Sequence, residues 1–148
     1  MRAYADSGLL ASLYLEESTS QIATDTVSSQ SAQMLMTWLT KLEVENAFHR
    51  AAFRGKITPD EARALITQFR SNIETAAYEH LIPDPEAMYI ESSRLADLYT
   101  ASLGVRTLDL LHVATAVMFG ASCFLSLDHR QRAVATALGL HVLPIITP

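Results

Sequence analysis

The stretch RTLDLLHVATA, Arg106 to Ala116, places an aspartate in the first turn of an otherwise apolar predicted helix. A helix that is apolar nearly all round is a buried helix, and a buried carboxylate is paired or bound to metal. Asp109 therefore needs a partner. Three other acidic residues occupy similar places, each near the point where a predicted strand leads into a helix: Asp6, Glu43 and Asp128.

These four acidic residues would gather at one edge of an open α/β sheet, where ligands bind outside the carboxyl ends of the strands. Carboxylates within a few ångströms of one another oppose ionisation, and a cation removes that conflict. Oxygen donors without clustered histidine or cysteine suit Mg²⁺ or Mn²⁺. Such a site can polarise a phosphodiester and activate water. The simpler alternative is that each acid only stabilises the first turn of its helix.

The elements that must position these residues alternate along the chain. Predicted strands cover residues 2–5, 34–38, 122–127 and 141–145. One helix is predicted directly after Asp6, and a longer one from Thr40 to Gly55. Further helices are predicted from the capping box Thr58–Glu61 onward, over 85–103, from a cap at Thr107 onward, and over 130–139. Residues 16–33 form a helix or a loop. This alternation predicts a parallel sheet covered by helices on both faces.

One predicted helix carries a regular apolar stripe after its capping box. Its members recur at helical spacing and should face the core: Ala62, Leu65, Ile66, Phe69, Ile73 and Ala77. We therefore expect a second long helix after the one that begins at Thr40.

Composition limits the class of protein. The 148 residues suit one domain, 1–148, and 49% apolar with 18% charged residues suits a globular fold. The net charge of −5 argues against a nonspecific nucleic-acid coat but not against a nuclease that reaches phosphate through a cation. No apolar run approaches the ~20 residues of a membrane span. The single cysteine excludes a disulfide framework, so we expect a cytoplasmic protein.

Four segments of the chain resemble, in order and spacing, the four acidic motifs of PIN-domain ribonucleases. They are YADSGLL, LTKLEVENAF, RTLDLLHVATA and FLSLDHRQRAVATALGL. The length is also similar to that of the VapC-type toxins of bacterial toxin-antitoxin pairs. The family commonly has threonine two residues before the last aspartate, where this chain has Ser126, which preserves the hydroxyl.

The resemblance implies a three-layer α/β PIN-like domain and Mg²⁺- or Mn²⁺-dependent endonucleolytic cleavage of RNA. The residues that match the catalytic and metal-binding acids of the family are Asp6, Glu43, Asp109 and Asp128. The resemblance further implies a cognate antitoxin as protein partner and a homodimer.

Two glutamates compete for the second motif. Glu43 and Glu45 lie about 200° apart around a helix, so they cannot share one face. Glu45 favours an ion pair in solvent, whereas Glu43 shares its face with Arg50 and Arg54. We therefore assign Glu43 to the site. The two arginines either contact RNA phosphates or form surface salt bridges.

Several polar residues near the acids have two interpretations. His112, one turn after Asp109, is better explained as a hydrogen-bonded core histidine than as a metal ligand, because no second histidine has matching spacing. Ser7 and Ser126 either bond the carboxylates or water, or cap their helices.

Other classes of protein fit less well. A haloacid-dehalogenase-type phosphatase needs an aspartate two residues after Asp6, where Gly8 stands, and a receiver domain needs a late lysine, whereas the lysines are Lys41 and Lys56. The alternative from a different class is a PIN-like module that binds RNA or protein without cutting. Four clustered acids argue against such a module, because a scaffold gains nothing from their repulsion.

Overall fold

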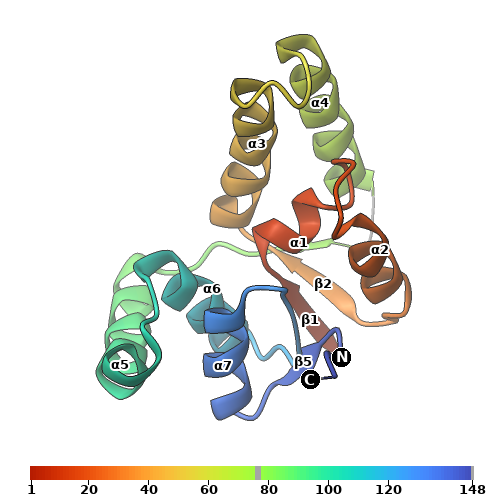
Figure 1. Ribbon diagram of the computed structural model, residues 1–148. Helices are drawn as coiled ribbons and strands as arrows, with labels where there is room; N and C mark the ends of the chain where they lie inside the picture. Colours follow the sequence, from red (N-terminus) through yellow and green to blue (C-terminus); the bar gives the residue numbers. More distant parts are fainter. Residues whose placement is uncertain (76–77, 148) are drawn as a thin grey trace.

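The computed structural model describes residues 1–75 and 78–147 and contains a five-stranded sheet in which every pairing is parallel (Figure 1). The order across the sheet is β3-β2-β1-β4-β5. The strands are β1 (Arg2–Ala5), β2 (Gln33–Met36), β3 (Tyr78–His80), β4 (Cys123–Leu125) and β5 (His141–Leu143). The strand from the start of the chain is therefore the central one.

Helices cover both faces of the sheet. One face carries α1 (Ser7–Ala11), α2 (Ser20–Ser28), α3 (Trp38–Phe53) and α4 (Pro59–Thr75), drawn at the upper right of Figure 1. The other face carries α5 (Pro85–Leu103), α6 (Thr107–Met118) and α7 (His129–Ala137). The three layers predicted from the alternation of strands and helices are thus present.

Alternating side chains of the central strand divide the core in two. Ala3 and Ala5 pack among the buried residues of α1 to α4, whereas Tyr4 between them packs with those of α5 to α7. This is the two-residue repeat of a strand that is buried on both faces. Each of the two helical layers therefore has its own apolar cluster.

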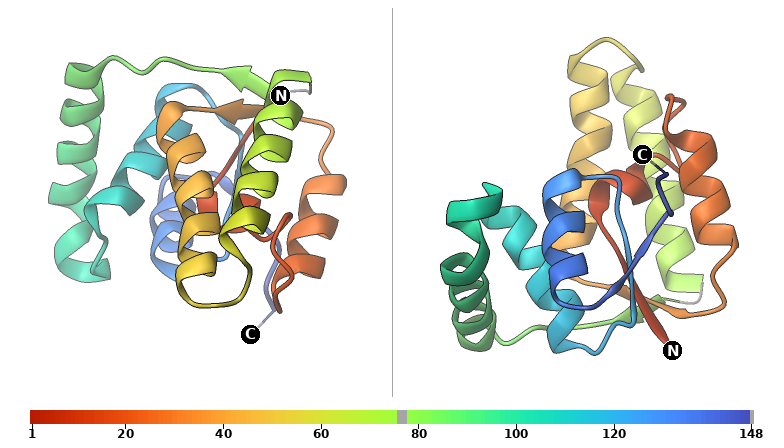
Figure 2. Two further views of the ribbon diagram at one scale, coloured as in Figure 1. Left: turned by 90° about the horizontal axis from the view of Figure 1, so that it is seen from above. Right: turned by 60° about the horizontal axis from the view of Figure 1, so that its bottom comes forward.

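The long helices α3 and α4 stand side by side in both views of Figure 2. The predicted capping box begins α4, since Thr58 N donates to Glu61 Oε2 (2.6 Å) and Glu61 N donates to Thr58 Oγ1 (3.1 Å). The apolar stripe of α4 is buried or half-buried from Ala62 to Ile73, and Ala77 lies outside the described residues.

The predicted boundary between the second strand and its helix was wrong. The strand ends at Met36, and Thr37 caps α3 by accepting a hydrogen bond from Thr40 N (3.4 Å). Trp38, predicted as a buried strand residue, begins the helix and is 65% exposed. The helix starts two residues earlier than expected, so Glu43 lies in its second turn.

The predicted cap of α6 was also wrong. Thr107 is the first helical residue, and Arg106 is the N-cap. The carboxylate of Asp109, the third helical residue, accepts a hydrogen bond from Arg106 N (3.1 Å) and so satisfies the N–H of the N-cap residue, as the acidic member of a capping box does.

The strand β3 was not predicted at all. It has three residues, Tyr78 to His80, none of them buried, so it lacks the apolar run that marks an interior strand. The predicted strands at 122–127 and 141–145 are shorter than expected, and residues 16–33 contain α2. None of the helices in the described residues combines the length and apolar character that a membrane crossing requires.

Candidate active site

A pocket of about 700 Å³ lies at the carboxyl ends of β1 and β4. Its lining includes all four predicted acids, Asp6, Glu43, Asp109 and Asp128. Each comes from a different segment: the end of β1, the second turn of α3, the first turn of α6 and the N-cap of α7. The parallel topology thus brings together residues that are far apart in the sequence.

Asp6 forms the part of the pocket wall that directly follows β1. It is 4% exposed, and its Oδ1 accepts a hydrogen bond from Leu9 N (2.7 Å) while Oδ2 accepts one from Ser126 Oγ (2.6 Å). Burial raises the pKa of Asp6, and the hydrogen bond from Ser126 acts in the opposite direction. A cation in the pocket would favour the ionised carboxylate.

Asp128 both caps a helix and lines the pocket. Its Oδ1 accepts hydrogen bonds from Arg130 N (2.9 Å) and Gln131 N (3.0 Å) at the start of α7. Its own N–H donates to Ser126 Oγ (3.0 Å). Ser126 therefore contacts two of the acidic segments through one hydroxyl, whereas the capping role considered for it belongs to Asp128.

Asp109 has the partners that its burial requires. It is 3% exposed, with Oδ1 accepting from Gln131 Nε2 (3.1 Å) and Oδ2 accepting from Arg106 Nε (3.3 Å) as well as from Arg106 N. The Arg106 guanidinium also lies 3.9 Å from Asp128 Oδ2. Sequence reasoning missed Arg106 and Gln131, although each stands three residues from an assigned acid.

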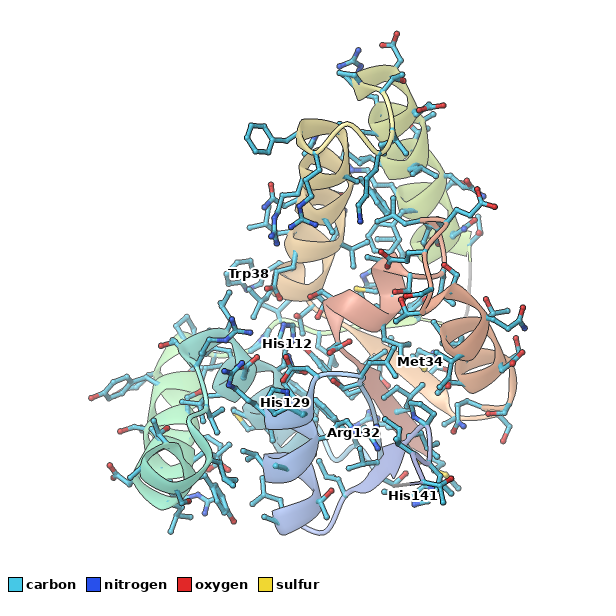
Figure 3. All side chains as sticks on the ribbon, viewed as in Figure 1. Met34, Trp38, His112, His129, Arg132 and His141 are labelled. Carbon is cyan, nitrogen blue, oxygen red and sulfur yellow. The ribbon has the colours of Figure 1, made fainter. Side chains whose placement is uncertain are left out.

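Glu43 is held by two side chains at one oxygen. Its Oε1 accepts a hydrogen bond from Ser7 Oγ (3.2 Å) and contacts His112 Nε2. Figure 3 shows His112, a residue of α6, near the middle of the molecule and below α3. His112 is buried and its Nδ1 lies 2.6 Å from Tyr4 Oη, which agrees with a hydrogen-bonded core histidine.

Glu45 lies away from this site, as the helical-face argument predicts. Its two carboxylate oxygens accept hydrogen bonds from Arg70 Nε (2.7 Å) and Nη2 (2.9 Å) on α4. The ion pair holds the pKa of Glu45 below its ordinary value. Glu45 therefore joins α3 to α4, and Glu43 is the glutamate at the pocket.

Basic side chains continue from the acidic pocket along α3. Arg50 lines the pocket, and Arg50, Arg54 and Lys56 line an adjoining pocket of about 390 Å³. Within residues 1–75 and 78–147 neither arginine forms an ion pair, so the salt-bridge interpretation does not describe this structure. Sequence reasoning missed Lys56, two residues after Arg54.

The donor set fits Mg²⁺ or Mn²⁺ by its chemistry. All four acids offer carboxylate oxygens to one pocket, and Mg²⁺ usually takes one or two carboxylates and keeps several waters. Within the described residues no three acidic, histidine or cysteine side chains stand close enough to form a ready-made metal site. An ion would therefore be held through few direct ligands.

The similarity of this chain to known proteins lies in its fold and not in its sequence. The sequence matches no protein-family model and no curated protein. Solved structures do resemble it. VapBC-1 from nontypeable Haemophilus influenzae has a TM-score of 0.63 at 16% identity, covering 97% of both chains. A toxin-antitoxin complex from Klebsiella pneumoniae has a TM-score of 0.62 at 14% identity, covering 88% of this chain and 90% of that one.

A third similar structure is FitAcB from Neisseria gonorrhoeae, with a TM-score of 0.63 at 9% identity and coverage of 96% of both chains. The chain thus has the PIN-like α/β fold that the four acidic motifs predicted. One of the structures that share this fold, that from Klebsiella pneumoniae, was solved as a toxin-antitoxin complex.

Proposed function

We propose that the protein is a metal-dependent endoribonuclease that acts as the toxin of a toxin-antitoxin pair. The observation that carries this proposal is the meeting of four acidic side chains from four separate segments in one pocket. The fold shared with toxin-antitoxin complexes supports it. Clustered acids cost stability, so their presence in one pocket favours a bound cation.

The four pocket acids, Asp6, Glu43, Asp109 and Asp128, would together hold the ion, one or two of them directly and the others through its bound waters. Mg²⁺ or Mn²⁺ bound there would polarise a phosphodiester and lower the pKa of bound water. Ser126 holds Asp6, and Ser7 holds Glu43. These hydroxyls would keep the carboxylates oriented when no cation is bound.

The basic residues beside the pocket would bind the RNA backbone. Arg50 lies between the acidic pocket and the adjoining one, and Arg54 and Lys56 extend the positive charge. Phosphates that neighbour the cleaved bond would contact these side chains, which suits an acidic protein with a net charge of −5. The overall charge then weakens nonspecific binding while the local charge retains substrate.

An antitoxin and a second copy of the chain are the proposed protein partners. An arginine of the antitoxin can bind two carboxylate oxygens at once and displace a metal ion. Three apolar side chains of α3 are exposed and would contact a partner: Trp38, Leu42 and Phe53. Pairing about a two-fold axis is the usual symmetry for such a homodimer.

Cleavage of RNA by the purified chain tests the enzyme. We expect wild type to cut RNA with MgCl₂ or MnCl₂ and not with EDTA, and Asp6→Asn to be inactive. Circular dichroism should show both proteins folded, since the amide avoids burying a charge. Mn²⁺ should raise the Tm of wild type and not of Asp6→Asn, because a ligand of the folded state stabilises it.

Two outcomes would contradict the proposal. A folded wild-type chain that binds RNA but cuts none with either metal would favour the non-cleaving module. Expression of wild type alone, at confirmed levels, should arrest growth while Asp6→Asn should not. Unimpaired growth together with absent cleavage would exclude the toxin function.

A further inference from the structure

A row of buried polar groups runs from the core to the pocket. Thr40 Oγ1 lies 3.0 Å from Tyr4 Oη, Tyr4 Oη lies 2.6 Å from His112 Nδ1, and His112 Nε2 contacts Glu43 Oε1. Tyr4 and Thr40 are 0% exposed and His112 is 1% exposed. The row starts at Thr40 on α3, passes through Tyr4 of the central strand and His112 of α6, and returns to α3 at the pocket carboxylate of Glu43.

The chemistry of the end group sets the direction of these hydrogen bonds. An ionised carboxylate can only accept, so His112 Nε2 donates to Glu43. When the ring carries a single proton at Nε2, its Nδ1 accepts and Tyr4 Oη is the donor. Burial raises the pKa of Tyr4 well above its ordinary value, so the phenol keeps its proton. Thr40 in turn can donate to Tyr4, and every group has a partner.

The two hydrogen bonds of Glu43 leave one oxygen for a ligand. Both His112 and Ser7 contact Oε1, and within the described residues Oε2 has no hydrogen-bond partner. The side chain is 25% exposed at the pocket wall. The carboxylate is thus anchored through one oxygen and open through the other.

Stability alone does not account for this row. Replacing both members of a buried hydrogen-bonded pair by apolar groups of similar shape can be nearly neutral, whereas a buried group left unpaired is costly. A tyrosine and a histidine buried in the core must therefore have all their polar atoms hydrogen-bonded, and they gain little folding free energy over apolar residues of similar shape. Orientation of the group at the end of the row is what they provide.

We propose that Tyr4 and His112 are positioning residues for Glu43, holding its carboxylate so that Oε2 is presented to the metal ion of the pocket. This inference rests on the proposed function. Hydrogen-bond partners that orient ligands typically change metal affinity or activity by about 10–100-fold when removed.

The ring of His112 gives a test that needs neither metal nor RNA. Long-range ¹H–¹⁵N spectra of the full chain, with His112 assigned by the missing signal in His112→Gln, report which ring nitrogen carries the proton. We expect the proton on Nε2 alone. A proton on Nδ1 would overturn the inference, because Tyr4 would then not be the donor.

Metal binding and cleavage give the second test. His112→Leu should weaken Mn²⁺ binding, measured by EPR titration with MnCl₂, by about 10–100-fold and lower kcat by a similar factor with little change in KM. His112→Gln should recover most of both, since its amide can donate at the position of Nε2. Tyr4→Phe, which removes only the hydroxyl, should fall between them.

The matched control is Thr115→Val, which removes a buried hydroxyl one turn later on α6 that bonds to Leu111 O (2.7 Å). It should lower Tm without changing Mn²⁺ affinity. Equal Mn²⁺ affinity in wild type, His112→Leu and Thr115→Val would overturn the positioning role. Intact Mn²⁺ binding without RNA cleavage by wild type would instead contradict the nuclease and leave the positioning role standing.

Discussion

Ser126 Oγ donates a 2.6 Å hydrogen bond to Asp6 Oδ2 across 120 residues of sequence. The same hydroxyl accepts a hydrogen bond from Asp128 N. It therefore links the carboxyl end of the central strand to the start of α7, through a serine and an aspartate that are both buried. One oxygen thus contacts the side chain of Asp6 and the backbone of Asp128.

Ser126→Ala should lower the free energy of unfolding by about 1–3 kcal/mol, because the carboxylate of Asp6 and the N–H of Asp128 both lose a buried partner. Urea unfolding in EDTA measures the change. Ser126→Thr keeps the hydroxyl and should retain the Mn²⁺ affinity that Ser126→Ala loses. Wild-type stability and metal affinity in Ser126→Ala would refute the link.

Glu43→Gln and Glu45→Gln form a matched pair two residues apart on α3. We expect Glu43→Gln to abolish cleavage, because a pocket carboxylate is lost. Glu45→Gln should keep cleavage and lower Tm by less than about 4 °C, because it breaks the ion pair with Arg70. Cleavage assays and thermal melts separate the two effects, and the reverse pattern would show that the wrong glutamate has been assigned.

Arg50→Ala and Arg54→Ala should each raise KM for RNA while changing kcat little, because they would remove contacts to phosphates away from the bond that is cut. Each should also reduce the slope of log affinity against log salt concentration, by about 0.7 for each lost single-strand phosphate contact. Arg63→Ala is the control, since Arg63 is exposed on α4 and paired with Asp60. If the slope of log affinity against log salt concentration is unchanged in all three variants, Arg50 and Arg54 do not contact RNA phosphates.

Burial raises the pKa of Tyr78 to about 12, with the nearby Tyr14 phenol adding to the effect. The folded chain therefore keeps a proton that the unfolded chain releases near the ordinary value of 10.0. Stability should fall as the pH rises from about 10 to about 12. Urea midpoints at pH 9 and pH 11 should diverge less in Tyr78→Phe than in wild type. Tyr89→Phe, at a side chain that is 72% exposed, should behave as wild type does.

Much of the fold follows from patterns within short windows of the sequence. The Thr58–Glu61 capping box and the bounds of the helix over 85–103 depend on local signals, and both occur as predicted. The boundary between β2 and α3 could not be predicted from the apolar character of Trp38. A large apolar residue is compatible both with a buried strand and with the exposed first turn of a helix. Strand β3 is too short and too exposed to leave a pattern.

The candidate site also has a part that the sequence predicts, the four acids, and a part that it does not, their hydrogen-bond partners. The four acids could be placed together because each lies near a junction between a strand and a helix, and parallel topology gathers such junctions. Their partners could not be found so readily. His112 contacts a residue 69 positions away, and Gln131 reaches Asp109 across 22. Such pairs depend on how helices pack, which periodicity alone does not specify.

The position of β1 at the centre of the sheet also bears on synthesis of the protein. Its neighbours are β2 and β4, and Asp6 is paired with Ser126, which the ribosome reaches 120 residues later. A growing chain that ends before Asp128 holds Asp6, Glu43 and Asp109 but lacks the fourth pocket acid. The pocket therefore has all four of its acids only after nearly the whole described chain has been synthesised.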